Sequence, residues 1–377
     1  MRILVAGDFC PSDRVATMVA NKDYSFFDGV KDIIREADYS IVNFECPVVE
    51  VDVKPIAKCG PALRTERAAV AAMKYAGFSC ATLANNHFRD FGDSGCLTTL
   101  EELEAQDMDY VGGGKTLAEA QKVLYKDIQG KKVAFVNFCE NEFSIATEKQ
   151  AGAAPLDSVD NYHQITEARR NADFVLVIVH GGHEHYQLPS PRMKKLYRFF
   201  VEIGADAVVN HHQHCYSGYE YYKGKPIVYG LGNFCFDGNR NGGNHIWNEG
   251  YCVVFDTESF EIELIPYTQC EVEVNIVPIA EADLVAFYAR IEELNTIIED
   301  DILLKAEFEK WVQKCSKSKM ITFAPYFHRY LNAAAHRGWI PMRLTALNAG
   351  RMLNHIACEA HRDITIQVMH DKLNETL

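Results

Sequence analysis

Short apolar runs alternate with amphipathic segments along about the first 210 residues of the 377-residue chain. Apolar runs bounded by polar loops are typical of buried strands, and apolar residues three and four positions apart are typical of helices. The pattern predicts buried strands at residues 3–6, 39–43, 79–83, 174–179 and 205–209, separated by helices and one hairpin. Strands that alternate with helices predict an α/β fold with parallel strands.

The remainder of the chain changes pattern twice. Residues 216–229 and 251–277 alternate apolar and polar positions, which predicts strands joined by hairpins. From about residue 281 the spacing becomes helical, with helices expected at 283–299, 303–314, 322–336 and 341–372. We therefore expect one domain over residues 1–277 and a helical C-terminal extension over residues 278–377.

Composition places the chain among soluble globular proteins, with 48% apolar and 24% charged residues. No apolar run is long enough to span a membrane, and the first strand begins too early to leave room for a signal peptide. The 12 cysteines lack paired spacing, which favours reduced thiols over a disulfide framework. These features predict a cytoplasmic protein with no membrane span.

The net charge of −14 is unevenly distributed. Residues 301–377 carry 11 Lys and Arg against 7 Asp and Glu, so the preceding residues carry −18. Such an acidic body argues against a nucleic-acid partner. It is compatible with a metal site built from carboxylates.

Each of the five predicted buried strands ends in side chains that commonly bind metals. In chain order these are Asp8; Asn43 and Glu45; Asn85, Asn86 and His87; His180, His183, Glu184 and His185; and His211, His212 and His214. A parallel sheet would bring all of these loops to one edge, within reach of one metal centre. Mixed oxygen and nitrogen ligands suit Mn, Fe or Zn better than Ca or Mg.

A glycine triplet, Gly112 to Gly114, precedes a short predicted helix. Glycines before a helix can cradle a phosphate. The lysine-serine signature of a phosphate loop is absent, so the sequence favours a tight turn.

A series of motifs carries a family resemblance: Gly7-Asp8, Asn43-Phe44-Glu45, Asn85-Asn86-His87 with Asp90, His180-Gly181-Gly182 with Glu184-His185, His211-His212-Gln213-His214 and Gly230-Leu231-Gly232-Asn233-Phe234. Over about residues 1–270 the chain resembles the CapA family of poly-gamma-glutamate and capsule synthesis proteins. That family is related in fold to calcineurin-like metallophosphoesterases. The resemblance implies a layered αββα sandwich and assigns residues 1–277 to a CapA-like metallophosphoesterase domain.

The resemblance also implies a site with one or two divalent metal ions, with Mn²⁺ favoured over Zn²⁺ or Fe²⁺. Glu45 matches the bridging position, Asp8 and His214 would bind one ion, and Asn86, His180 and His212 would bind the other. His87 matches the residue that protonates the leaving oxygen. Asp90 either orients His87 or caps the helix that begins near Gly92. Further residues expected to contact substrate are Asn43, Arg14, Arg89, Glu184, His185, His211 and Asn233.

Several positions leave alternatives open. Arg14 and Arg89 could pair with nearby acidic loops instead of a phosphate, and His185 could be part of an ordinary loop surface. Where the wider superfamily has Asp-x-His, this chain has Asp8-Phe9-Cys10, so one ion could lack a nitrogen ligand. Cys10 could replace it or simply pack in the core.

The sequence therefore predicts a metal-dependent hydrolase, a phosphoesterase that uses metal-activated water on an anionic small molecule or a glycan or capsule precursor. One alternative is a metal-dependent amide or gamma-glutamyl hydrolase. Another is a noncatalytic factor for poly-gamma-glutamate or capsule biosynthesis that binds an anionic polymer. His87 directly after Asn86 favours an enzyme, because simple binding needs no proton donor. The basic, aromatic C-terminal helices could pair protomers into a homodimer, dock on the acidic body or cover the active site.

Overall fold

The computed structural model describes residues 1–58, 60–238, 245–322, 328–341 and 345. Met1–Leu304 forms one compact unit, and residues 305–377 form a separate one. The first unit includes helix α9 (Glu281–Glu299), whose Asn295 accepts a hydrogen bond from the backbone of Tyr219 (2.7 Å). The expected division at residue 277 stays a prediction.

The first sheet has eight strands in the order β16-β15-β14-β1-β2-β3-β4, and β13 also pairs with β1. Strands β1 to β4 are parallel, and β14 to β16 continue the sheet as antiparallel neighbours. The central strand β1 therefore lies between β2 and β14. The strands are β1 (Arg2–Phe9), β2 (Tyr39–Phe44), β3 (Cys80–Thr82), β4 (Asp109–Val111), β13 (Asn233–Cys235), β14 (Glu249–Asp256), β15 (Ile262–Gln269) and β16 (Ile276–Pro278).

The second sheet has six strands in the order β11-β12-β10-β9-β7-β6. Its inner strands are parallel and its two edge strands are antiparallel to their neighbours. All seven residues of β9 are buried, as expected for a parallel strand covered on both faces. The strands are β6 (Leu124–Ile128), β7 (Lys131–Cys139), β9 (Phe174–His180), β10 (Ala207–His211), β11 (Tyr219–Tyr222) and β12 (Lys225–Val228), and β5 (Gly113–Gly114) pairs separately with β8 (Gly152–Ala153).

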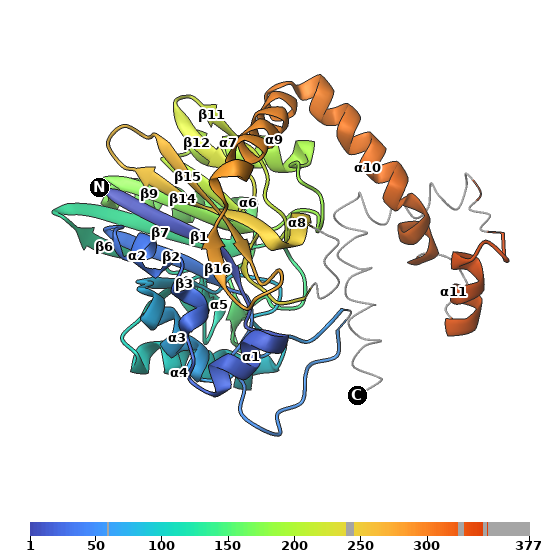
Figure 1. The fold of residues 1–377 in the computed structure, drawn as a ribbon, viewed down its shortest axis with the longest axis horizontal. Coiled ribbons are helices and arrows are strands. Elements are labelled where there is room, and N and C mark those ends of the chain that lie inside the picture. The colour runs from blue at the N-terminus through green and yellow to red at the C-terminus, as the bar shows by residue number, and fades with distance from the viewer. Residues whose placement is uncertain (59, 239–244, 323–327, 342–344, 346–377) are drawn as a thin grey trace. The chain divides into compact units, whose positions relative to one another are not determined.

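The two sheets face each other, and helices cover their outer faces (Figure 1). Between the sheets, Tyr39 of β2 stacks on Phe135 of β7 with ring centroids 5.0 Å apart. The predicted αββα sandwich is confirmed. The first sheet is covered by α1 (Asp13–Ala20), α2 (Lys31–Arg35), α3 (Ala68–Ala76) and α4 (Gly92–Ala105), and the second by α6 (Ser158–Asn171) and α7 (Pro191–Glu202).

Local sequence explains where the two helices over the second sheet begin. Asp157 accepts hydrogen bonds from the first amides of α6, and Ser190 accepts one from Met193 at the start of α7. Pro191 occupies the first turn of α7, where no amide hydrogen is needed. The cap of α6 lies before β9 and the cap of α7 lies after it, so the two helices begin on either side of the strand that ends in His180.

The structure corrects the expectation that five strand ends meet at the edge of one parallel sheet. Strands β1, β2 and β3 belong to the first sheet, whereas β9 and β10 belong to the second. An apolar run predicts a strand but not its partner, since pairing depends on residues far away in the chain. The strand ends still converge, because the two sheets bring the same ends together.

Other elements differ from the predicted ones. Helix α1 and strand β13 were not predicted, because each is short and only Val15 and Val19 of α1 are buried. The alternating segment 251–277 ends in the short strand β16, and the chain between β1 and β2 includes a 3-10 turn (Ser25–Phe27) followed by α2. Helix α10 (Asp301–Thr322) is longer than expected, and α11 (Arg329–His336) covers part of the helix expected at 322–336. The helix expected at 341–372 lies almost entirely outside the described residues.

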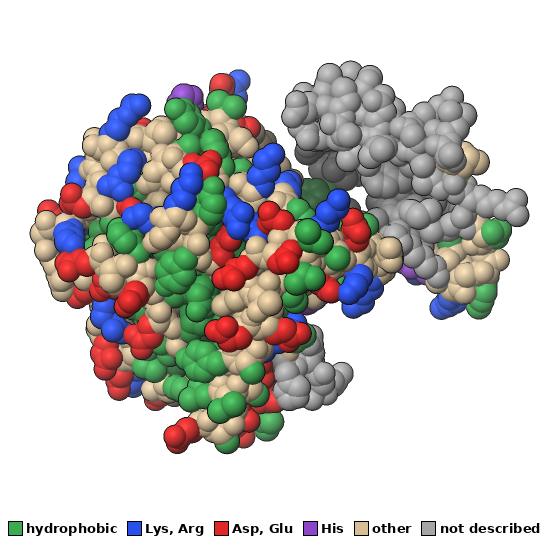
Figure 2. All heavy atoms as spheres, turned by 90° about the horizontal axis from the view of Figure 1, so that it is seen from above, with side chains coloured by type: hydrophobic (Ala, Val, Ile, Leu, Met, Phe, Trp, Pro, Cys, Tyr) green, Lys and Arg blue, Asp and Glu red, His purple; other side chains and the backbone are tan. Residues whose placement is uncertain are grey.

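None of the described helices combines the length and apolar character that a membrane crossing requires. The nine cysteines described as free thiols are all buried. On the face shown in Figure 2, acidic and basic side chains of the described residues are interspersed. Many cations are paired locally: Arg67, for example, contacts the carboxylates of Glu50, Glu101 and Glu102.

Candidate metal centre

Four strand ends from the two sheets meet at one point. Asp8 lies near the end of β1, Glu45 follows β2, His180 ends β9, and His212 follows β10. Asn43 joins the two sheets, because its Nδ2 lies 2.8 Å from Asp8 Oδ1 and 3.2 Å from His180 Nδ1. The polar strand ends thus form a buried cluster of carboxylates and imidazoles.

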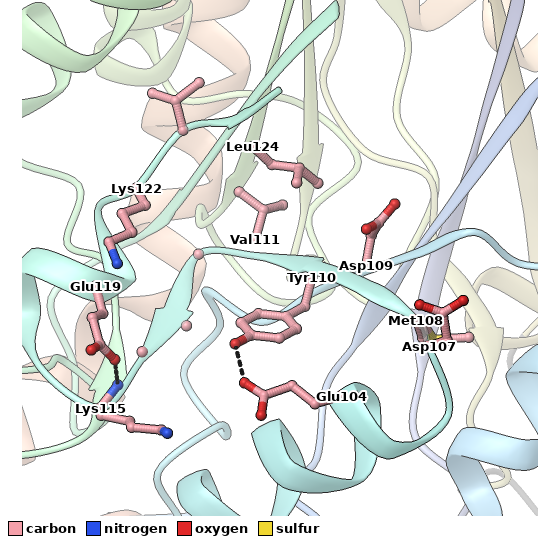
Figure 3. A pocket seen from close by; sticks show the side chains of 14 residues that line it. Glu104, Asp107, Met108, Asp109, Tyr110, Val111, Lys115, Glu119, Lys122 and Leu124 are labelled. Atoms are coloured by element: carbon pink, nitrogen blue, oxygen red, sulfur yellow. Dashed lines mark hydrogen bonds between the residues drawn. The ribbon is translucent and has the colours of Figure 1, made fainter. Parts of the chain in front are cut away.

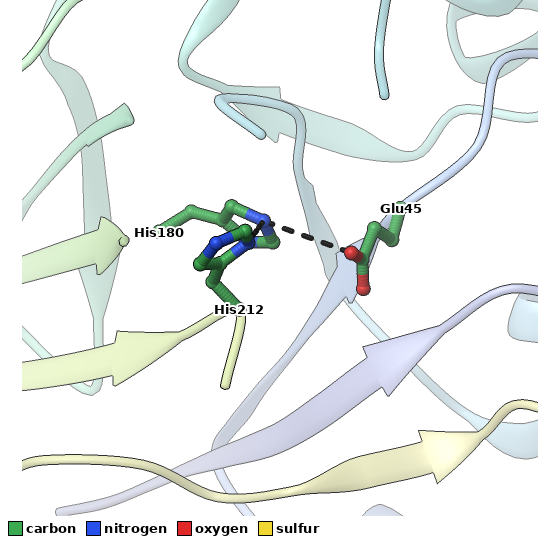
Figure 4. Close-up of side chains that lie close together, drawn as sticks. All are labelled: Glu45, His180 and His212. Carbon is green, nitrogen blue, oxygen red and sulfur yellow. Dashed lines mark hydrogen bonds and ion pairs between the residues drawn. The ribbon is translucent and has the colours of Figure 1, made fainter. Parts of the chain in front are cut away.

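Glu45, His180 and His212 form the first candidate set of metal ligands (Figure 4). One ligand atom from each lies within 4.8 Å of the others, and all three residues are buried. His180 Nε2 lies 3.7 Å from Glu45 Oε1 and 3.1 Å from His212 Nδ1. Asn86 extends this set, since its Oδ1 lies 2.9 Å from His180 Nε2.

Asp8, Glu45 and His214 form the second candidate set. His214 Nδ1 lies 3.8 Å from Asp8 Oδ2, and His214 Nε2 lies 3.7 Å from Glu45 Oε1. Glu45 belongs to both sets. The geometry is that of a carboxylate shared between the two candidate ligand sets.

The environment of Glu45 tests whether metal ions fit this centre. Both of its carboxylate oxygens are buried and have no hydrogen-bond partner among the described residues. A buried carboxylate without a partner is costly, so such groups normally pair with a cation or bind a metal. The residues therefore fit divalent ions, and the mixture of oxygen and nitrogen donors suits Mn, Fe or Zn.

The pKa values of His180, His212 and His214 agree with a role as metal ligands. Burial lowers the pKa of His212 to about 4, and it also lowers the pKa of His180 and of His214. These imidazoles are therefore neutral at pH 7, as metal binding requires.

The pKa values of the two candidate carboxylate ligands, Asp8 and Glu45, shift in opposite directions. Burial opposes ionisation of Asp8, but the hydrogen bond and the electrostatic attraction of His211 outweigh it, and the pKa of the Asp8 carboxyl group is lowered. Burial, together with the charge of Asp8, raises the pKa of Glu45 well above its ordinary value. A cation beside Glu45 would oppose that rise, because it favours the charged carboxylate.

The backbone of the histidine loop is strained. His212 and His214 have φ values of 93° and 53°, in the left-handed region that residues with a Cβ rarely adopt. The amide of His212 donates to Asp8 Oδ2 (3.3 Å), and Asn233 Oδ1 lies 2.9 Å from His214 Nδ1. Strain of this kind is found where surrounding contacts hold a functional geometry.

His87 and Asp90 lie beside the two ligand sets. His87 Nδ1 is 2.7 Å from Asp90 Oδ2, which leaves the other ring nitrogen of His87 available to the adjoining cavity. Asp90 does not cap α4, because the residue in the cap position is Phe91. Of the two roles left open by the sequence, the geometry favours orientation of His87.

Lys58 is a site residue that the sequence did not indicate. Its ammonium contacts Asp90 Oδ1 and lies 3.2 Å from His87 Nδ1, and its side chain is only 5% exposed. The amide of Leu63 also donates to Asp90 Oδ2 (2.7 Å). A single lysine in the irregular segment 50–63 carries no periodic signal, so nothing in the sequence distinguishes it from a surface lysine.

Not all the residues expected to contact substrate face an open space. Arg14 forms two bonds to the carboxylate of Asp237 (2.9 and 2.8 Å), and Arg89 pairs with Asp93 (2.7 Å). His211 Nδ1 lies 3.1 Å from Asp8 Oδ1. Like Asn43 and Asn233, His211 is buried and contacts a candidate ligand, so these three side chains support the ligands.

A cavity of about 400 Å³ adjoins the centre. His87, His214, Glu184 and His185 line it, and contact of Glu184 and His185 with substrate stays a prediction. The sequence did not indicate the aromatic part of its wall. The further lining residues are Pro61, Leu63, Phe236, Gly238 and Trp247.

A larger cavity of about 610 Å³ surrounds the glycine triplet (Figure 3). A Cβ on Gly112 would lie 2.0 Å from Asn137 Oδ1, and one on Gly113 would lie 2.8 Å from Leu83 Cβ. Polar groups in its wall pair with each other, such as the hydroxyl of Tyr110 with Glu104 (2.9 Å). Close packing therefore explains these glycines, in agreement with a tight turn.

Cys10 belongs to neither ligand set among the described residues. It is buried, and a hydrogen bond with Cys46 together with burial raises the pKa of its thiol. This environment favours core packing.

The fold and the site define an αββα sandwich protein with a candidate two-metal centre. The chain belongs to the family described as bacterial capsule synthesis protein PGA_cap, whose model matches residues 2–238. The resemblance drawn from the motifs is thereby confirmed.

Curated relatives agree with this assignment. A capsule biosynthesis protein CapA from Bacillus anthracis is 36% identical over 246 residues, which are 63% of this chain and 60% of the relative. A PGA biosynthesis protein CapA from Bacillus subtilis (strain 168) is 35% identical over 216 residues, 56% of this chain and 57% of the relative. The matches thus span about 60% of the length of these relatives.

Similarity to solved structures is weaker. A structure described as a novel phosphatase from Mycoplasma pneumoniae is 13% identical, covers 77% of this chain and 98% of its own, and has a TM-score of 0.46. A 5'-nucleotidase precursor from Thermus thermophilus is also 13% identical, covers 78% and 59%, and has a TM-score of 0.42. Scores of this size support no argument about activity.

Proposed function

We propose that the protein is a metal-dependent hydrolase, a phosphoesterase that acts on an anionic small molecule or a capsule-type precursor. The observation that carries the proposal is the position of Glu45. Its carboxylate has no hydrogen-bond partner among the described residues and is shared by two sets of ligand side chains. Such an arrangement suits two divalent ions bridged by one carboxylate.

The two sets of ligand side chains would each hold one ion. Asp8, Glu45 and His214 would hold one ion, and Glu45, Asn86, His180 and His212 the other. Bound divalent ions would supply Lewis acidity to a phosphoryl group. Asn43, His211 and Asn233 orient the ligands through the contacts described above, a role that is common around metal centres.

His87 would act as the general acid. It lines the cavity next to His214, and Asp90 holds its other ring nitrogen at 2.7 Å. Protonation of a leaving oxygen requires a donor within hydrogen-bond reach of the bound substrate, and His87 meets that condition for a group in the cavity. Arg14 and Arg89 have no part in this proposal, because both are paired with carboxylates.

Hydrolysis of an amide or gamma-glutamyl bond is a second candidate for the same site. Its motivation is the name of the Bacillus subtilis relative, a PGA biosynthesis protein, which makes a gamma-glutamyl polymer a substrate class to test. The same ligands would serve, and His87 would protonate the leaving amine.

Metal analysis combined with esterase assays tests the proposal. Protein loaded with Mn²⁺ is expected to bind two equivalents and to release phosphate from an aryl phosphomonoester or phosphodiester. His87→Ala should lower kcat by about 100-fold or more while metal content stays at two equivalents. His163→Ala is the matched control, since His163 is an exposed histidine of α6.

Other outcomes would redirect the assignment. Metal binding without ester turnover, together with cleavage of gamma-glutamyl amides, would favour the second candidate. Binding of an anionic polymer with no turnover of either substrate would favour a noncatalytic role. Failure to bind metal would overturn the proposed centre.

A further inference from the structure

An aromatic wall lies beside the candidate metal centre. Trp247 of α8 (His245–Asn248) has its ring 5.1 Å from His214 and 5.9 Å from His185, measured between centroids. Phe236 meets the Trp247 ring edge-on at 5.2 Å. Three aromatic neighbours thus hold the indole next to a candidate metal ligand.

Contacts at the edge of the indole ring fix the orientation of Trp247. Its Nε1 donates to the carbonyl of Phe236 (2.9 Å), so the polar atom of the indole is already bonded. A Cβ on Gly238 would lie 3.0 Å from Cζ2 of Trp247, so the absence of a side chain at Gly238 makes room for the ring. A ring held in this way has little rotamer freedom to lose when a ligand binds.

Part of the Trp247 ring is open to the cavity. Its side chain is only partly buried, and it lines the same cavity as His87 and His214. A ligand group in contact with Trp247 would therefore share the cavity with the proposed proton donor and lie close to the candidate metal ligand His214. In the proposed reaction His87 protonates the leaving oxygen, so a leaving group bound in this cavity would lie in the space that Trp247 also lines.

The chemistry of the cavity indicates what that group is. Among the described residues that line it, Glu184 supplies a carboxylate and there is no lysine or arginine. A negatively charged leaving group would therefore be repelled by Glu184, whereas an uncharged ring would gain contact with the indole face. Aromatic and sugar rings both stack well on such faces.

We propose that Trp247 is a specificity-determining residue, and that its ring stacks on an uncharged, ring-bearing leaving group of the substrate. The inference rests on the proposed hydrolase function and narrows its substrate class. An extended anionic chain is therefore a disfavoured leaving group, because Glu184 would repel it.

Two esters with leaving alcohols of similar acidity test this inference. Release of phosphate from benzyl phosphate and from methyl phosphate is measured with Mn²⁺-loaded protein. In Trp247→Ala the ratio of kcat/KM for benzyl to methyl phosphate should fall about 10-fold. Trp247→Phe retains a ring and should keep the ratio within about twofold of the native protein.

A binding measurement gives a readout that needs no turnover. Calorimetry with benzylphosphonate and methylphosphonate should show the same selective loss, about 10-fold weaker for the benzyl compound in Trp247→Ala. A proportional loss for both compounds in both assays would overturn the stacking role. Absence of turnover with either ester would instead contradict the phosphoesterase function, and the phosphonate titrations would then decide separately whether Trp247 selects a ring.

Discussion

His180 and Glu45 connect the two sheets: Nε2 of His180, at the end of β9, lies 3.7 Å from Oε1 of Glu45, which follows β2. These residues are 135 positions apart in the chain and belong to different layers. A metal ion between them would link the sheets directly. Its removal should therefore affect stability as well as activity.

Glu45→Gln should have opposite effects with and without metal. In metal-free protein the native carboxylate is buried without a hydrogen-bond partner, so a neutral amide should leave the free energy of unfolding unchanged or raise it by about 1 kcal/mol. In Mn²⁺ the variant should be less stable than the native protein and should bind fewer equivalents. Urea unfolding with EDTA or Mn²⁺ measures both.

Glu220→Gln is the control for that substitution. Glu220 is also buried, but it is paired with Arg198 through two hydrogen bonds (3.0 and 2.6 Å). Its substitution should destabilise the protein to the same extent with and without metal. If Glu45→Gln behaved in the same way, Glu45 would not be a metal ligand.

Lys58→Met should destabilise the protein by about 3 kcal/mol, because it leaves the buried carboxylate of Asp90 without its ammonium partner. Lys31→Met provides the comparison. The Lys31–Asp28 pair is closer to solvent, with Asp28 50% exposed, so its loss should cost much less than loss of the Lys58 pair. Similar small losses for both variants, measured by urea unfolding, would show that the Lys58 pair contributes little.

Metal-free protein should lose stability as the pH falls from about 6.5 to about 4. Burial depresses the pKa of His212 to about 4, so the unfolded chain binds protons in this range before the native state does. His180 and His214 shift in the same direction, whereas the raised pKa of Glu45 opposes them. The native state is therefore favoured at the upper end of the range.

Comparing variants isolates the histidine contribution. In His212→Gln the loss of stability between pH 7 and pH 5 should be smaller by about 2 kcal/mol than in the native protein. In His163→Gln, which removes an exposed histidine, the loss should match the native one. Equal pH dependence in all three proteins would show that His212 titrates normally.

Arg14→Met separates a structural role from substrate binding. Arg14 holds the buried carboxylate of Asp237, so its loss should lower the free energy of unfolding by about 3 kcal/mol. A higher KM with no loss of stability would instead return Arg14 to the substrate site. Unfolding and kinetic measurements on the same preparation distinguish these results.

Much of the ligand set could be predicted from the sequence, because two local signals coincide. An apolar run marks a strand, and a polar side chain directly after it marks an end where active sites gather. Asp8, Glu45, His180, His212 and His214 all carry both signals, and the structure brings them together.

Long-range and irregular features could not be predicted. The division of the strands between two sheets depends on pairings such as β1 with β14, which no local pattern specifies. Lys58 and Trp247 come from a loop and a four-residue helix, where periodicity carries no information. The sequence also left open whether the two arginines contact substrate. Only the three-dimensional structure shows that Arg14 pairs with Asp237 and Arg89 with Asp93.

The position of β1 between β2 and β14 has a consequence for biosynthesis. Arg2 to Val5 pair with residues 253–256, so one side of the central strand stays open until almost 250 further residues have been made. At ordinary translation rates this interval lasts roughly 10 to 50 seconds. During that time the nascent chain presents an unpaired apolar strand edge, which invites aggregation or the binding of a chaperone. Ribosome-bound chains that stop before residue 249 should therefore depend on chaperones far more than the finished protein does.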